Sequence, residues 1–66
     1  MDNTIIIEIR QQNETCQLHN VYVGYNKSPH RRLHSMALSL DEAKILAVNI
    51  IIGNKDYKAV ILLDVF

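Results

Sequence analysis

The chain has 66 residues, of which 48% are apolar, and its seven basic and seven acidic side chains give a formal net charge of zero. This length suits one domain spanning residues 1–66, and a domain of this size buries only about 60% of its unfolded surface. Cys16 is the only cysteine, so an intrachain disulfide is excluded. The charge balance lacks the basic excess that is typical of nucleic-acid-binding domains. We therefore expect a single domain that depends on tight packing or on self-association.

The N-terminal residues show no pattern for export or for membrane insertion. The apolar run Ile5–Ile7 is too short for a signal peptide or a membrane span, and no basic segment precedes it. We therefore expect a cytoplasmic protein that does not bind membranes.

The first part of the chain alternates between two faces, as half-buried strands do. Residues 4–10 predict one strand and residues 16–25 predict a second. The residues that share the apolar faces are Ile5, Ile7 and Ile9 in the first strand and Val21, Val23 and Tyr25 in the second. The polar residues 11–15 predict a hairpin loop, so the two strands should pair antiparallel.

A surface loop and a helix are predicted next. Residues 26–32 contain the only proline and predict the loop, and residues 33–38 form either a short third strand or the approach to the helix. Ser39 and Glu42 have the spacing of a capping box, which predicts a helix over 40–52. Gly53 is expected to end this helix in a left-handed conformation.

The last predicted element is a strand over 57–66. The order β-β-(β)-α-β predicts the α+β class, with a small, mostly antiparallel sheet of three to four strands and one helix packed on a face. The β-branched residues within 45–52 leave a strand as the alternative there, but the capping box and the glycine favour the helix.

The predicted helix and last strand are more apolar than one helix packed on one sheet requires. One helical stripe would cover the sheet, namely Leu40, Ala43, Leu46, Ala47, Ile50 and Ile51. A second stripe lies well away from it, and the last strand is apolar on both faces, which is typical of a strand covered on both sides. We therefore predict a homodimer or a tight complex with a different protein, and the dimer interface is expected to contain Ile45, Val48, Ile52, Val60 and Leu62. The alternative is ordinary exposed apolar surface.

The most distinctive polar stretch is residues 27–34, which carry three basic residues, two histidines and no acid. Arginines can contact phosphates while nearby tyrosines stack on bases, and the same groups can dock on an acidic protein. The candidate contacts for a protein partner or a nucleic acid are Tyr22, Tyr25, Lys27, His30, Arg31, Arg32 and His34. A solvated loop is the alternative.

No constellation for catalysis or for a cofactor stands out. Cys16, His19, His30 and His34 do not have the spacing of a closed zinc site, so we expect exposed histidines and no metal. Cys16 is not expected to act as a nucleophile with His19 as its base, because side chains three residues apart in a strand point to opposite faces. It is expected to be a small, partly buried strand residue. The sequence shows no pair of carboxylates placed for acid–base work.

These features predict a non-catalytic protein–protein interaction module without a cofactor or a small-molecule substrate. A small inhibitor or adaptor, such as one encoded by a phage or mobile element, is one form of this role. A small nucleic-acid-binding protein that uses residues 27–34 is the alternative.

Overall fold

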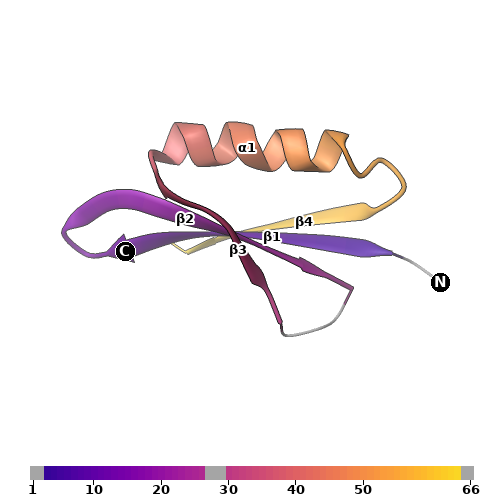
Figure 1. The fold of residues 1–66 in the computed structure, drawn as a ribbon, viewed down its shortest axis with the longest axis horizontal. Helices are drawn as coiled ribbons and strands as arrows, with labels where there is room; N and C mark the ends of the chain where they lie inside the picture. Colours follow the sequence, from indigo (N-terminus) through magenta and orange to yellow (C-terminus); the bar gives the residue numbers. More distant parts are fainter. Residues whose placement is uncertain (1–2, 27–29, 65–66) are drawn as a thin grey trace.

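A computed structural model describes residues 3–26 and 30–64 of the chain. Its elements are β1 (Thr4–Asn13), β2 (Cys16–Tyr25), β3 (Arg32–Leu38), α1 (Leu40–Ile52) and β4 (Lys58–Asp64). The helix packs along one face of the sheet, as Figure 1 shows. The predicted α+β class is therefore confirmed, and residues 33–38 belong to a third strand, which is the first of the two alternatives for that segment. The predicted end of the last strand, at residues 65 and 66, lies outside the described residues.

The sheet has four strands in the order β3-β2-β1-β4. Two of its three pairings, β1 with β2 and β2 with β3, are antiparallel, whereas β4 runs parallel to β1. Helix α1 makes this parallel pairing possible, because it returns the chain from β3 to the opposite edge of the sheet. The prediction of a mostly antiparallel sheet with one helix on a face is confirmed.

The hairpin between β1 and β2 is tighter than the sequence pattern predicts. Strand β1 extends through residues 11–13 of the polar segment, and Asn13 pairs with Cys16 across the turn. The Asn13 side-chain oxygen accepts hydrogen bonds from the backbone N–H groups of Thr15 and Cys16, at 3.0 and 2.8 Å. An asparagine that turns the chain with its own side chain needs few further loop residues.

The hydrophobic core lies between α1 and the sheet. Its fully or almost fully buried members are Ile5, Ile7, Ile9, Val21, Val23, Ala43 and Ala47. The two alanines lie where the helix meets the strands, and their small side chains allow a close approach. The other residues of the predicted inner stripe are partly buried against this cluster. The predicted sheet-facing stripe of the helix is thus confirmed.

Both ends of α1 are capped by side chains. The Ser39 hydroxyl accepts from the Glu42 N–H at 3.2 Å, and the Glu42 carboxylate accepts from the Ser39 N–H at 3.3 Å. Gly53 is right-handed, with φ −73°, so the predicted left-handed cap is wrong. The Asn54 side-chain amide instead donates to the Ile50 carbonyl at 2.7 Å and satisfies a terminal carbonyl group. In the described ranges, no helix has the length and apolarity to cross a membrane.

Candidate interaction surface

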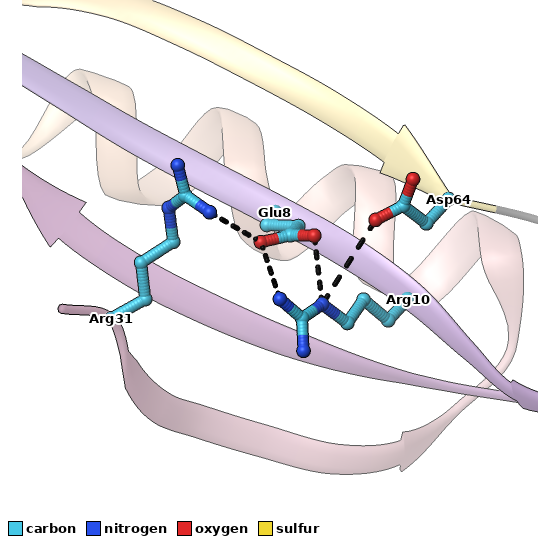
Figure 2. A network of polar contacts seen from close by, with 4 residues as sticks. All are labelled: Glu8, Arg10, Arg31 and Asp64. Carbon is cyan, nitrogen blue, oxygen red and sulfur yellow. Dashed lines mark hydrogen bonds and ion pairs between the residues drawn. The ribbon is translucent and has the colours of Figure 1, made fainter. Parts of the chain in front are cut away.

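The face of the sheet away from α1, here called the open face, carries a buried carboxylate. Glu8 in β1 is only 4% exposed, although no helix covers it. The Arg10 guanidinium donates to both Glu8 oxygens, from Nε at 2.7 Å and from Nη2 at 3.1 Å. Arg31 donates from Nη1 to Oε1 at 2.8 Å (Figure 2). Two guanidinium groups therefore shield this carboxylate from water.

Local geometry explains how both arginines reach Glu8. Arg10 is two residues along the same strand, so its side chain points to the same face. Arg31 precedes β3 and must pass over β2, where Gly24 lies beneath it. A Cβ atom on Gly24 would lie 2.9 Å from Arg31 Cγ and 3.0 Å from the His30 carbonyl oxygen. The missing side chain thus leaves room for the Arg31 stem.

A second carboxylate joins this network from β4. Parallel pairing sets Asp64 beside Arg10, with 3.9 Å between Asp64 Oδ2 and Arg10 Nε. The close pair of carboxylates, Glu8 and Asp64, was missed by the sequence analysis. They are brought together by a pairing between the two ends of the chain, for which no local pattern gives a signal.

The network moves the pKa values of its two carboxyl groups in opposite directions. Hydrogen bonding by Arg10 is the main reason that the pKa of Glu8 falls from 4.5 to about 2, against the opposing effect of burial. A hydrogen bond with Glu8 is the main reason that the pKa of Asp64 is raised. Glu8 is therefore a fixed anion, while Asp64 holds a proton more readily than an ordinary aspartate. The network contains two carboxylates and two guanidinium groups, so its formal charges cancel. These four side chains link β4, β1 and the segment before β3.

The predicted tyrosine pair is not brought together. Tyr22 lies on the open face, where the Arg10 guanidinium is 4.8 Å from its ring centroid. Tyr25 packs edge to face on Tyr57, with 5.6 Å between ring centroids. Since residues three apart in a strand point to opposite faces, the two rings cannot form one stacking platform.

The predicted basic contact residues are also divided. Arg31 turns toward Glu8 and is ion-paired with it, whereas His30, Arg32 and His34 are exposed. His30 and Arg32 line a shallow hollow of about 310 Å³ with Val23, Gly24 and Tyr25. Lys27 lies outside the described residues. One of the three fixed charges of this stretch is thus matched by an internal carboxylate.

Strand β4 forms one edge of the sheet and presents apolar side chains to solvent on both faces. The exposed fractions are 42% for Val60, 47% for Ile61, 39% for Leu62 and 49% for Leu63. Helix α1 packs mainly on β2 and β1, the two central strands of the sheet, and less on β3. Within the single chain the helix lies over the centre of the sheet and leaves both faces of this strand exposed, so its cover by a second molecule stays a prediction.

A second exposed apolar surface is the outer stripe of α1, formed by Ile45, Val48 and Ile52. Their exposed fractions are 63%, 51% and 56%. The stripe lies on the opposite side of the helix from the buried Ala43 and Ala47. The predicted interface residues Val60 and Leu62 lie instead on the open face, since they pair with Ile6 and Glu8. The structure thus places the predicted dimer interface on two opposite sides of the molecule.

The histidines and the cysteine occupy different environments. His30 and His34 are exposed as predicted, whereas His19 is only 5% exposed, so the prediction is wrong for that residue. Its Nδ1 atom is buried and finds no hydrogen-bond partner among the described residues. Cys16 is partly buried, as predicted. Among residues 3–26 and 30–64, no cluster of three metal-binding side chains is present.

Comparisons of the chain with protein family models, with curated proteins and with solved structures give no match. The activity of a relative therefore cannot be transferred to this chain. Its function has to be inferred from the two exposed apolar surfaces and from the charge network between β1 and β4.

Proposed function

We propose that the protein is a non-catalytic protein–protein interaction module, a small cytoplasmic inhibitor or adaptor that acts as a homodimer. The observation that carries this proposal is the exposure of β4 on both faces. Its four central aliphatic side chains, residues 60–63, are each about two-fifths to one-half exposed. Contiguous apolar surface on an edge strand invites association, and proteins normally cover or interrupt such an edge.

The energy available from this surface is of the same order as the cost of association. Complete burial of an aliphatic side chain contributes about 1.5–3 kcal/mol, so the exposed part of four can contribute at most roughly 4 kcal/mol per copy. Two copies can contribute at most roughly 8 kcal/mol, which is comparable to the estimated cost of association, about 4–15 kcal/mol. A reversible dimer stabilised by further contacts is therefore the expected state.

Nucleic-acid binding through residues 27–34 has less support. The charge of Arg31 is matched by Glu8 at 2.8 Å. The tyrosines that would stack on bases lie on opposite faces of the sheet, and affinity for nucleic acid depends on the number of phosphates that cations neutralise.

The solution mass, measured by light scattering over a wide range of protein concentration, tests the homodimer. We expect the mass of two chains at high concentration and dissociation on dilution. A single-chain mass at every concentration would contradict the proposal. Leu62→Asp places a charge on the exposed face of β4 and should favour the monomer. Asn49→Asp makes the same change in net charge at an exposed polar position of α1 and is the matched control.

A further inference from the structure

The two edges of the sheet differ in their ability to accept another strand. The pairing of β3 with β2 is interrupted twice, on either side of Val21. The pairing of β4 with β1 runs without a shift in register from Lys58 to Asp64. A bulged edge is a poor template for a further strand, whereas a regular one is a good template. Only the β4 edge therefore suits the addition of a strand, which limits an assembly of this kind to two copies.

The backbone of β4 shows which of its residues face outward. The Lys58 N–H donates to the Asn3 carbonyl at 2.8 Å, so the polar backbone groups of Lys58 point toward β1. Backbone groups alternate in direction along a strand. The residues whose N–H and C=O groups point away from the sheet are therefore Ala59, Ile61 and Leu63.

The sequence of β4 is complementary to itself when it is read in the opposite direction. The strand has Lys58 at its first position, Asp64 at its last and five apolar residues between them. When two copies lie antiparallel with Ile61 opposite Ile61, each Lys58 lies opposite the other copy's Asp64. The same register pairs outward-facing residues with one another, so their hydrogen bonds can form.

We propose that a second copy of this chain adds its β4 to the β4 edge, antiparallel and centred on Ile61, so that one sheet continues through both copies. This pairing rests on the proposed homodimer and specifies its interface. It forms about six backbone hydrogen bonds between the copies. It also extends the open face from one copy to the other, because residues of even number stay on one side of the joined sheet.

The charge network supports this register. Asp64 lies close to Glu8, which raises its pKa, and its oxygen Oδ2 is 3.9 Å from Arg10 Nε, beyond hydrogen-bond distance. Lys58 of the second copy supplies a positive charge at the end of β4, where two carboxylates crowd together. The outer stripe of α1 lies on the far side of the helix and stays free for a different protein.

Charge reversal tests the pairing and its register together. Lys58→Glu places two acidic pairs across the dimer axis, and Asp64→Lys places two basic pairs there. Each variant alone should dimerise about tenfold more weakly, since opposed like charges destabilise paired strands. An equimolar mixture should regain dimers of mixed composition, because both opposite-charge pairs are then restored. Lys55→Glu, outside β4, is the control and should dimerise like the original chain. The proposed pairing would be overturned if the single variants dimerise as strongly as the original chain. It would also be overturned if the mixture dimerises no better than either variant alone.

Cysteine cross-linking separates failure of the pairing from failure of the homodimer. In a Cys16→Ser background, Ile61→Cys places two thiols on residues about 5.5 Å apart between Cα atoms, within the range of a disulfide. Val48→Cys, on the outer stripe of α1, should stay uncross-linked under the same oxidation. A cross-link through position 48 but not 61 would refute β4 pairing and preserve the homodimer. A monomer at all concentrations would refute both.

Discussion

The charge network predicts that Glu8 stabilises the fold through its charge, and that this contribution is lost in acid. We expect Glu8→Gln to lower the free energy of unfolding at neutral pH. Lowering of the Glu8 pKa from 4.5 to about 2 corresponds to roughly 3 kcal/mol, at about 1.4 kcal/mol per pH unit. Arg10 is 49% exposed and water screens its charge, so about 2 kcal/mol is the expected loss.

The direction of the pH effect follows from the lowered pKa. The folded chain holds the Glu8 proton less tightly than the unfolded chain, so the contribution is complete above pH 4.5 and disappears as the pH falls toward about 2. The free energy of unfolding in urea should therefore be lower for Glu8→Gln than for the original chain at pH 7. The two values should become equal as the pH approaches about 2. Both proteins must be measured at one concentration, because dimerisation adds to the apparent stability.

Asp64→Asn is the control for this experiment. The pKa of Asp64 is raised, so its contribution is present at low pH and is lost as the pH rises, which is the opposite of Glu8. Asp64→Asn should therefore not show the loss of unfolding free energy that is expected for Glu8→Gln at pH 7. If Glu8→Gln lowers the free energy of unfolding by the same amount at pH 7 and near pH 2, the charge of Glu8 is not the cause. The result would indicate that Glu8 stabilises the fold by packing instead.

Three further changes test local features by the midpoint of urea unfolding. Gly24→Ala should cost about 1–2 kcal/mol, because the new methyl group meets Arg31 and a carbonyl oxygen. Gly53→Ala is its control and should be neutral or stabilising by up to about 1 kcal/mol, since that residue is right-handed and unobstructed; equal losses would contradict the steric explanation. Ala37→Gly should stabilise by about 1 kcal/mol, because Ala37 has a φ of 61°; a loss would argue against strain there. Ser39→Ala should cost about 1 kcal/mol through loss of the capping hydrogen bond, and no change would refute that role.

Local patterns in the sequence were enough to predict most of the secondary structure. The alternation of Ile5, Ile7 and Ile9 predicts β1 and the face that forms the core. The capping box of Ser39 and Glu42 predicts the start of α1 at the residue where it begins. These patterns work because they depend on contacts within a few residues, or on which face of an element is apolar. The same patterns identified the apolar residues that the folded chain leaves exposed.

Only the tertiary structure decided how distant parts of the chain meet. Parallel pairing of β4 with β1 brings Asp64 to Glu8, and a glycine in β2 lets Arg31 cross to the same carboxylate. The tertiary structure also places the open-face residues Val60 and Leu62 on the opposite side of the molecule from the outer stripe of α1, which periodicity within each element cannot show. The physical reason is that strand order and register depend on the packing of the whole core, in which the helix carries the chain from β3 to the opposite edge.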